Sequence, residues 1–472
     1  MNKLYPTDKT HHQYVEYPQR WIQLVLFLCA LLSNIMFGFS LSPIVKEMSL
    51  VYQVDSRQEN IKCYRYLQFL TISFTVFSVI MIIPGNIINE KYGIRMSIMI
   101  GCALTFIGSI FAIFINVSFW FFFIGQLISL IGFPFRLISA SKFVANWFFP
   151  ENRILIMVII ALVFNASSGI AIRIPLIVLG DFQIHDHPTD EQIELGRALI
   201  ESLMFLLFGL MILLCIPPIL FFLSKPVTPP SYSASDECVR EDYNKASVIV
   251  ASNPDFILLT ISFAFILGTI TLFTLQMEYF ISPFDYSLKD QSNLVLVGVI
   301  AGLIGDICVG TAIKKTQSYK KVLRICNILV TVLFGILILA LHVNKVFFFI
   351  IYFLLCGSSA IMALTFEFSC ELCFPLSENT TIAMLGFFGN LLNFLQGIPE
   401  ILILKGDNQL CSTMTMIFML ILIGSSNILT MKINENLKRS EQDIQLDDRI
   451  EKKNTEVSLL EQSKFNNSND DY

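Results

Sequence analysis

Charged side chains are scarce in this sequence. Asp, Glu, Lys and Arg together make up 15% of its 472 residues, whereas a soluble domain carries about 25%. Hydrophobic residues make up 54%, and they fall in blocks of about 20 residues or more, the length that crosses a bilayer core. The composition excludes an ordinary soluble domain and predicts a multi-pass protein whose surroundings are the lipid bilayer. It gives no sign of a nucleic-acid partner, because the charges lie in loops and in the tail.

The sequence also lacks the clusters that bind metals or catalyse reactions. Its 11 cysteines lie mostly inside apolar blocks, so they do not read as a disulfide framework. Cys370 and Cys373 form a CxxC without a second pair, and His185 and His187 form an HxH in an acidic loop, for which a solvated loop is the simpler interpretation. No apolar block contains HExxH, GxSxG or a cluster of catalytic acids. We therefore expect no enzyme activity, no cofactor and no bound metal.

The apolar blocks predict an all-α membrane protein with twelve spans joined mostly by short connections. Each block is long enough to cross the bilayer as one helix. The predicted spans lie near residues 21–45, 66–88, 96–115, 119–141, 154–179, 198–223, 255–281, 293–313, 322–341, 346–366, 379–403 and 411–431.

Polar segments divide the chain into two halves of six spans each. Residues 224–253 are rich in Pro and Ser and predict a linker between an N-terminal half, 21–223, and a C-terminal half, 254–431. Residues 1–20 form an N-terminal tail, and residues 432–472 are charged and rich in Asn, which predicts a disordered tail.

Lys and Arg are distributed unevenly among the connections. Both termini, the 224–253 linker and the loops on their side carry about twice as many as the alternating loops. Because cytoplasmic loops are enriched in Lys and Arg, both termini and the linker are expected in the cytoplasm, and the 181–196 loop on the other side.

A short charged turn interrupts the apolar sequence between the second and third spans. The stretch Glu90-Lys91-Tyr92-Gly93-Ile94-Arg95 resembles the second part of G-x-x-x-D-r-x-G-r-k, a motif of the major facilitator superfamily, with Glu in place of Asp. The plan of six spans, a linker and six spans is also that of this superfamily. Gly93 permits a tight turn between two helices, and the resemblance implies a gating role for this turn, including Arg95.

Glu90 is expected to find a cation on the same side of the membrane. Arg153, in the matching turn after the fourth span, is the first candidate, and Lys142 is the second. Such a pair would lock the cytoplasmic side shut. The alternative is that a charged turn simply holds its loop in water.

The corresponding stretch of the second half, 302–324, keeps basic residues but has lost the acid, whose place is taken roughly by Lys314. A gate on this half would need another acid. Glu367, Glu371 and Glu378, around the turn after the tenth span, are available on that side.

Four further stretches narrow the resemblance. Together and in this order, they resemble the feline leukaemia virus subgroup C receptor-related family, solute carrier family 49. The resemblance covers most of the chain outside the linker and tail, and it implies transport of choline and ethanolamine, with haem also proposed for that family. The stretches are YPQRW (Tyr17–Trp21), SKFVANWFFPENR (Ser141–Arg153), GLIGDICVGTAIKKTQSYK (302–320) and FEFSCELCFPLSENTT (Phe366–Thr381).

The expected pocket departs from that family. Its choline-binding members use a Trp and a Tyr as an aromatic box, which attracts a quaternary ammonium through cation–π interaction. Those positions align with Gly38 and about Thr271, and two substrate-contacting glutamines align with Ala166 and Asn390, while Asn165 matches the family.

Arg136 and Arg173 lie in the fourth and fifth predicted spans, where an ionisable side chain is costly unless it faces a cavity or a partner. Both could bind an anionic group of the substrate in a central cavity. The alternatives are that they reach toward an interface or pair with an acid.

Further intramembrane polar residues carry two interpretations. Asn34, Asn165, Gln276 and Asn390 either bind substrate or form interhelical hydrogen bonds. Asp306 could carry a proton, although a structural pair with Lys314 or Lys315 is favoured.

The leading functional prediction is a transporter that moves a small organic solute by alternating access, as a monomer. An organic-anion or zwitterion carrier is an alternative reading of the altered pocket. A membrane receptor or scaffold on the same fold is an alternative of another class, and a channel is disfavoured by the plan of two halves.

Overall fold

The computed structural model describes most of the chain outside its two ends. The described part consists of helices joined by short connections, with no strand. It comprises residues 17–40, 44–52, 60–180, 189–228, 230, 243–275, 277–284, 286, 288–316, 318–359, 361–403, 409–435 and 437.

The helices fall into an N-terminal and a C-terminal series. The first series is α1 (Gln19–Phe39), α2 (Val45–Val51), α3 (Asn60–Tyr92), α4 (Ile94–Ile113), η2 (Phe114–Asn116), α5 (Phe119–Ile131), α6 (Phe133–Leu137), α7 (Ser139–Trp147), α8 (Pro150–Leu179) and α9 (Asp190–Phe221). The second is α10 (Tyr243–Ser252), α11 (Pro254–Leu275), α12 (Met277–Ile281), η4 (Ser282–Phe284), α13 (Leu288–Thr316), α14 (Tyr319–Val343), α15 (Lys345–Ser358), α16 (Met362–Cys373), α17 (Glu378–Ile403) and α18 (Gln409–Lys432).

Eleven helical stretches of the described chain are long and apolar enough to cross a membrane. Helix α3, with 33 residues, occupies the place of the second predicted span. Helix α3 is not among these eleven, so the predicted number of twelve spans stays a prediction. The fourth span consists of α5, α6 and α7 in succession, and the tenth of α15 and α16, so these two are not single uninterrupted helices.

Helices begin where local signals favour it. Thr189 and Gln192 form a capping box at the start of α9, and Asn344 caps α15 by accepting a hydrogen bond from the Val346 backbone, 3.0 Å away. Helices α4 and α5 approach closely at a pair of glycines, since a Cβ on Gly108 would lie 2.4 Å from the Gly125 carbonyl oxygen. Small residues at such crossings are the usual basis of helix packing in membranes.

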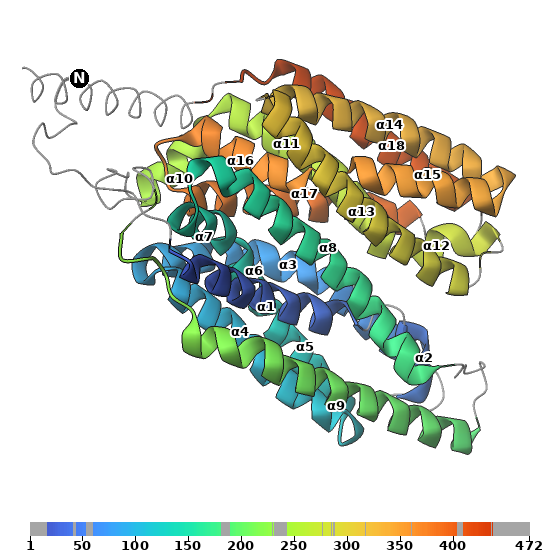
Figure 1. Ribbon diagram of the computed structural model, residues 1–472. Helices are drawn as coiled ribbons and strands as arrows, with labels where there is room; N and C mark the ends of the chain where they lie inside the picture. The colour runs from blue at the N-terminus through green and yellow to red at the C-terminus, as the bar shows by residue number, and fades with distance from the viewer. Residues whose placement is uncertain are drawn as a thin grey trace, which may run out of the picture.

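The two series form two bundles that lie side by side (Figure 1). They meet along two seams, where α3 packs against α17 and α8 packs against α13. At one end of the molecule α16 also packs against α8, and α17 against α7. Toward the other end, α2 and α12 lie well apart in Figure 1.

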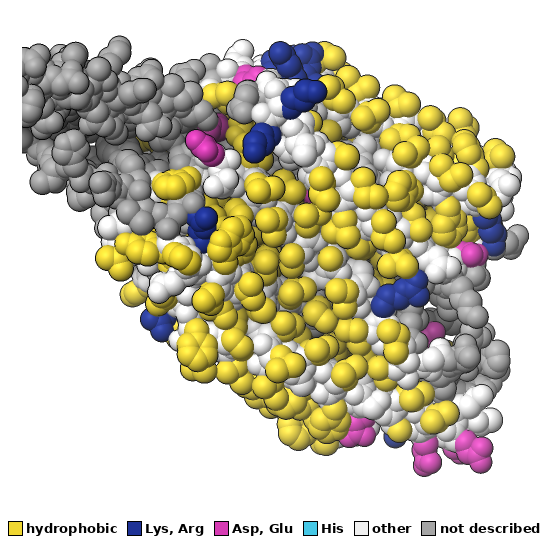
Figure 2. All heavy atoms as spheres, in the orientation of Figure 1, with side chains coloured by type: hydrophobic (Ala, Val, Ile, Leu, Met, Phe, Trp, Pro, Cys, Tyr) yellow, Lys and Arg dark blue, Asp and Glu magenta, His cyan; other side chains and the backbone are white. Residues whose placement is uncertain are grey.

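The outer surface is that of a membrane protein. Hydrophobic side chains cover the middle of the visible face, and most charged side chains lie toward its ends (Figure 2). Ile177, Leu213 and Leu339 are among the large apolar side chains that stay exposed. A surface of this kind requires lipid, so the chain is an integral, multi-pass membrane protein.

The predicted linker and tail are partly structured. Residues 243–252, inside the predicted 224–253 linker, form α10, which packs against α17. After α18, Ile433 is buried, and Glu435 accepts hydrogen bonds from the Ser318 hydroxyl at 2.8 Å and the Lys320 backbone at 3.2 Å. The start of the predicted disordered tail is therefore fixed against α14. The rest of the tail lies outside the described residues.

Candidate functional site

The charged turn singled out in the sequence joins α3 to α4. Gly93 has φ +85°, a backbone conformation that L side chains rarely adopt, so glycine is required at this turn. Its N–H donates to the Asn89 carbonyl at 3.0 Å, which ends α3. The Arg95 backbone N–H donates to the Ser224 hydroxyl at 3.1 Å, while the Arg95 side chain is exposed.

Glu90 joins both halves at this end of the molecule. The Lys142 ammonium, on α7 of its own half, lies 3.2 Å from one carboxylate oxygen. The Ser377 hydroxyl, just before α17 of the other half, donates to the second oxygen. Lys142 is the second of the two cations that the sequence proposes for Glu90. Arg153, the first, is buried near the start of α8.

Further polar contacts between the halves surround Glu90. The Asn86 amide donates to the Thr380 hydroxyl at 3.3 Å. In the orientation that satisfies its amide, Asn379 donates to the Ile138 carbonyl at 3.1 Å and accepts from the Lys142 ammonium at 3.3 Å. We call these residues the gate network: Asn86, Glu90, Lys142, Ser377, Asn379 and Thr380.

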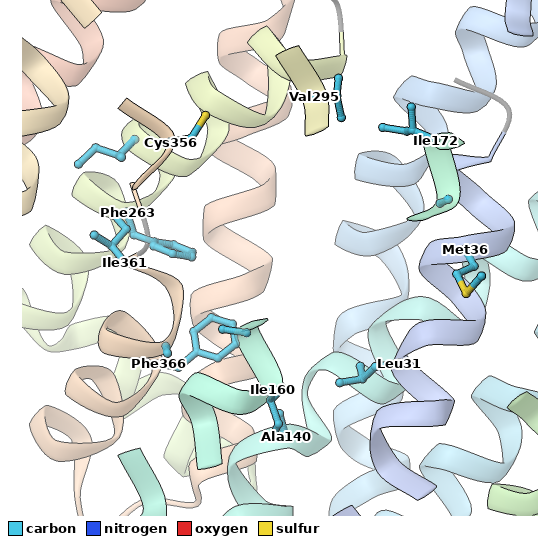
Figure 3. Packing of buried hydrophobic residues seen from close by; sticks show 14 of the residues in the cluster. Leu31, Met36, Ala140, Ile160, Ile172, Phe263, Val295, Cys356, Ile361 and Phe366 are labelled. Carbon is cyan, nitrogen blue, oxygen red and sulfur yellow. The ribbon is translucent and has the colours of Figure 1, made fainter. Parts of the chain in front are cut away.

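Apolar side chains of the two halves also pack together at the end of the molecule that holds the gate network. Phe366 of α16 lies beside Ile160 of α8, so side chains of the two halves meet there (Figure 3). Glu367 and Glu371, the acids proposed for a gate of the second half, are buried on the same helix, each about 4% exposed. The two halves are therefore joined through α16 and α17 at this end.

Two polar contacts join the halves along the α8–α13 seam. The Asn165 amide donates to the Asp306 carboxylate at 2.7 Å. Farther along α8, the Arg173 guanidinium donates to the Asn293 side-chain oxygen at 3.3 Å, at an exposed position. The expected pairing of Asp306 with Lys314 or Lys315 is wrong, because both lysines are exposed at the end of α13 and Asn165 holds the carboxylate.

Arg136 has a different environment. Its side chain is fully buried, and its guanidinium donates to the Ala30 carbonyl at 2.8 Å, the Ser33 hydroxyl at 2.8 Å, the Thr105 hydroxyl at 2.6 Å and the Gly132 carbonyl at 3.3 Å. All of these groups belong to the N-terminal half. We call this set the Arg136 network, and it favours the structural interpretation of Arg136 over anion binding.

Asn34 adjoins the same network. Its amide donates to the Thr105 hydroxyl at 3.2 Å and the Ser129 carbonyl at 2.8 Å, and the side chain is buried. These are interhelical hydrogen bonds, the alternative that the sequence left open for such amides.

The remaining pocket candidates lie on α11 and α17. Thr271 is half-buried, and the Asn390 amide donates to the Gly386 carbonyl of its own helix at 2.8 Å. Next to them, a Cβ on Gly268 would meet the side chains of Asn393 and Gln396. Gln276 lies outside the described residues.

No aromatic box is visible at the positions where the sequence resemblance places one. Gly38 is half-buried and lies near Leu130. Phe273 is 1% exposed and packs against other rings of the C-terminal half, among them Phe334 at a centroid distance of 6.0 Å. Phe37 is also buried. Neither ring is open to a ligand in this conformation.

Sequence reasoning missed the partners of these groups. Ser377, Asn379 and Thr380 lie in the quoted stretch SENTT, but their contacts with Glu90 and Asn86 depend on the docking of α17 onto α3. A run of five polar residues between two apolar spans was the available signal.

Comparison with protein families gives one match across most of the chain. The profile of the Major Facilitator Superfamily matches residues 25–404.

Curated relatives are similar at low identity over most of their length. The choline/ethanolamine transporter flvcr2a of Danio rerio is 26% identical over 90% of this chain and 88% of its own. The choline/ethanolamine transporter FLVCR2 of Rattus norvegicus is 24% identical, covering 89% and 75%. An uncharacterized MFS-type transporter of Caenorhabditis elegans is 25% identical, covering 89% and 70%.

Solved structures share the fold. The proton:xylose symporter XylE superposes with a TM-score of 0.66 at 10% identity, covering 89% of this chain and 98% of its own. The Escherichia coli fucose:proton symporter FucP has a TM-score of 0.63 at 13% identity, covering 87% and 98%. The predicted fold and the predicted family resemblance are both confirmed.

Proposed function

This chain belongs to the Major Facilitator Superfamily and is a transmembrane transporter of a small organic solute, and we propose that it works by alternating access with the gate network as its cytoplasmic gate. The observation that carries the proposal is Glu90. One carboxylate binds Lys142 of its own half and Ser377 of the other, so separating the halves at this end must break that bridge.

The bridge is suited to repeated opening. Glu90 and Lys142 keep 22% and 14% of their side-chain surface exposed, so water screens the pair. A partly exposed pair contributes about 1 kcal/mol or less. An interaction of this size can bias two conformations without preventing their exchange.

The gate end is proposed to face the cytoplasm. This end carries the α3–α4 turn, with Lys91 and Arg95, and the start of α14, with its lysines. By the enrichment of Lys and Arg in cytoplasmic loops, both termini and the 224–253 linker belong on this side.

Epitope tags test this orientation. A tag in the 224–253 linker, and tags at either terminus, should bind antibody only after the cells are permeabilised, whereas a tag beside His187 should bind antibody in intact cells. If the linker tag and the His187 tag were accessible from the same side, the topology would be wrong.

For the substrate we propose a small solute with a primary ammonium group, related to the ethanolamine of the relatives' names, in preference to choline. A quaternary ammonium needs aromatic faces, and Gly38 and Thr271 supply none. A primary ammonium instead donates hydrogen bonds. The side-chain amides of Asn390, Asn393 and Gln396, on α17 next to α11, offer acceptors.

The alternative anionic substrate has less support. It depended on Arg136 and Arg173, but the Arg136 guanidinium donates its hydrogen bonds to groups inside the N-terminal half. Arg173 alone remains at the seam, where it contacts Asn293. An anionic or zwitterionic solute therefore becomes one outcome of the substrate test.

The test is uptake of labelled ethanolamine, choline and a panel of organic anions in cells expressing the chain. Each missing ring contact costs a quaternary ammonium about 0.5–2 kcal/mol. Two such losses predict choline uptake weaker than ethanolamine uptake by about fivefold to several hundredfold, at about 1.4 kcal/mol per tenfold. Asn390→Ala should reduce ethanolamine uptake, and Arg173→Gln should leave it unchanged.

Three results would contradict these assignments. Saturable choline uptake at least equal to ethanolamine uptake would refute the substrate preference, and anion uptake abolished by Arg173→Gln would support the alternative. A chain that reaches the membrane and moves none of the panel would favour the receptor or scaffold interpretation.

A further inference from the structure

The seam between α8 and α13 is closely packed along its length. A Cβ on Gly310 of α13 would lie 2.7 Å from the Val158 side chain of α8, and one on Gly302 would lie 3.6 Å from the Asn165 amide. Gly302, Asp306 and Gly310 are spaced four residues apart, so they share the face of α13 that meets α8. Asp306 is therefore the acidic member of a row of small residues between the two halves.

This carboxylate lies deep in the membrane. Asn165, its partner, is 15 residues from the first residue of α8 and 14 from the last, which is about 21–22 Å from either end at 1.5 Å per residue. Asp306 is 2% exposed. Substrate and coupling-ion sites of such transporters lie at this depth, between the repeats.

Within the described residues, the Asp306 carboxylate has one hydrogen-bond partner, the Asn165 amide at 2.7 Å, and no ion-pair partner. Along α8, Arg173 is eight residues from Asn165, or about 12 Å, and Arg153 is twelve residues away, or about 18 Å. Arg173 contacts Asn293 instead.

None of the other titratable groups described on α13 and its neighbours contacts the carboxylate. They are Asp290, Cys308, Lys314 and Lys315 on α13, Glu151, Arg153 and Arg173 on α8, Tyr319, Lys320, Lys321, Arg324, Cys326 and His342 on α14, Lys345, Tyr352 and Cys356 on α15, and Glu367, Cys370, Glu371 and Cys373 on α16.

A buried carboxylate with no cation beside it is unfavourable in its charged form, because no opposite charge offsets the loss of hydration. A proton removes the charge and needs no additional room, whereas an organic cation would require the packed seam to open. We propose that Asp306 is a proton-binding site that couples pH to the separation of α8 and α13. The proposal rests on the alternating access proposed above.

The proton balance is simple. When the seam admits water, the carboxylic acid releases one proton to that water and the carboxylate remains. When the seam closes, one proton from water is bound again, and the neutral acid is buried beside Asn165. Acidic conditions therefore favour the packed seam, since the conformation that binds the proton more tightly gains population as pH falls.

The proposed proton site can be tested without a substrate. The measurement is the distance between the two halves at the end of the molecule away from the gate network. Val117, between η2 and α5, and Val343, at the end of α14, are 73% and 74% exposed, so spin labels at Val117→Cys and Val343→Cys fit there. The protein is the full chain with its native cysteines replaced, in lipid nanodiscs, and its distance distribution is measured from pH 5 to pH 8. We expect two populations whose ratio changes at least about threefold, since one bound proton allows up to tenfold per pH unit.

Three variants of α13 and one of α8 show which residue causes the pH response. Asp306→Asn, which copies the shape of the neutral acid, should remove the pH dependence, and Asp306→Glu should retain it. Asp290→Asn is the matched control, because it removes a half-buried acid of α13 that already pairs with Lys345 at 3.1 Å, and it should not change the pH response. Asn165→Ala removes the donor that stabilises the charged form, so the transition should move to higher pH.

Several outcomes would overturn the proposal. They are an unchanged pH response in Asp306→Asn, a transition that moves to lower pH or stays in place in Asn165→Ala, and two populations that respond to 10 mM ethanolamine but not to pH. In the last case alternating access would stand and only the proton site would fall. A single population that ignores both pH and ethanolamine would overturn the proposed mechanism and this site together.

Discussion

The gate network and the Arg136 network use polar side chains for opposite purposes. The gate network lies between the halves and relies on one partly exposed ion pair and a few hydroxyl and amide contacts. The Arg136 network lies inside one half, and its guanidinium is fully buried with hydrogen bonds to four groups. In the proposed transport cycle, the contacts that break are individually weak, whereas the contacts inside one half are buried and involve every nitrogen of the guanidinium.

The comparison predicts its largest effect at Arg136. Arg136→Met keeps much of the side-chain volume but leaves the Ser33 and Thr105 hydroxyls without their charged donor. Hydrogen bonds to a charged group contribute about 1.5–3 kcal/mol each, so we expect a loss of about 3 kcal/mol or more in the free energy of unfolding. The measurement is the monodisperse fraction and melting temperature of the purified protein.

Arg173→Gln is the matched control for that experiment. This arginine is in the same half but makes its contact with Asn293 at an exposed position, so its loss should change the free energy of unfolding by about 1 kcal/mol or less. Arg136→Lys should rescue only part of the stability, because an ammonium keeps the charge but not the planar set of donors. Equal melting temperatures for Arg136→Met and Arg173→Gln would show that the Arg136 network stabilises the fold no more than one exposed contact does.

A smaller effect is predicted at Glu90. Glu90→Gln keeps a hydrogen-bonding group near Ser377 but removes the charge that binds Lys142. Because the pair is partly exposed, we expect the ratio of the closed to the open population to fall by about two- to fivefold, corresponding to about 0.4–1 kcal/mol, with surface expression unchanged. The measurement is the distance between spin labels at Tyr92→Cys and Lys315→Cys, exposed positions at the gate end of the two halves, together with the uptake rate.

Asp290→Asn serves as the comparison for Glu90→Gln. It breaks the exposed ion pair with Lys345, which joins α13 to α15 within one half, so the populations at the gate end should not change. If Glu90→Gln left both the label distances and the uptake rate as in the wild type, the gate network would be a structural contact without a role in the transport cycle.

The features that were predictable are those that depend on neighbouring residues. The turn at Gly93 follows from a motif of six consecutive residues, and its positive φ is a local property. Lys142 was one of two partners predicted for Glu90. The sequence places both Lys142 and Arg153 on the same side of the membrane as Glu90, but it does not determine which of them reaches the carboxylate. The break in the tenth span was not predicted, since the apolar character of that span continues through the break.

The Asp306 site shows what spacing did not reveal. Lys314 and Lys315 are near it in sequence, but they lie eight and nine residues away along α13 and end in an exposed position. Asn165 is 141 residues away and becomes its partner only when α8 docks onto α13. The charged residues nearest to Asp306 in the sequence therefore did not identify its partner.

By itself, the sequence determined the long apolar helices that can cross a membrane and the turn at Gly93. It did so because hydrophobic length and the need for backbone hydrogen bonds inside lipid leave few alternatives to long helices. The tertiary structure decided which polar groups meet: Arg136 inside one half, Glu90 and Ser377 between the halves, and Asp306 with Asn165 along the seam. Partner choice depends on which face each helix presents and at what depth, and these are fixed only when all the helices pack together.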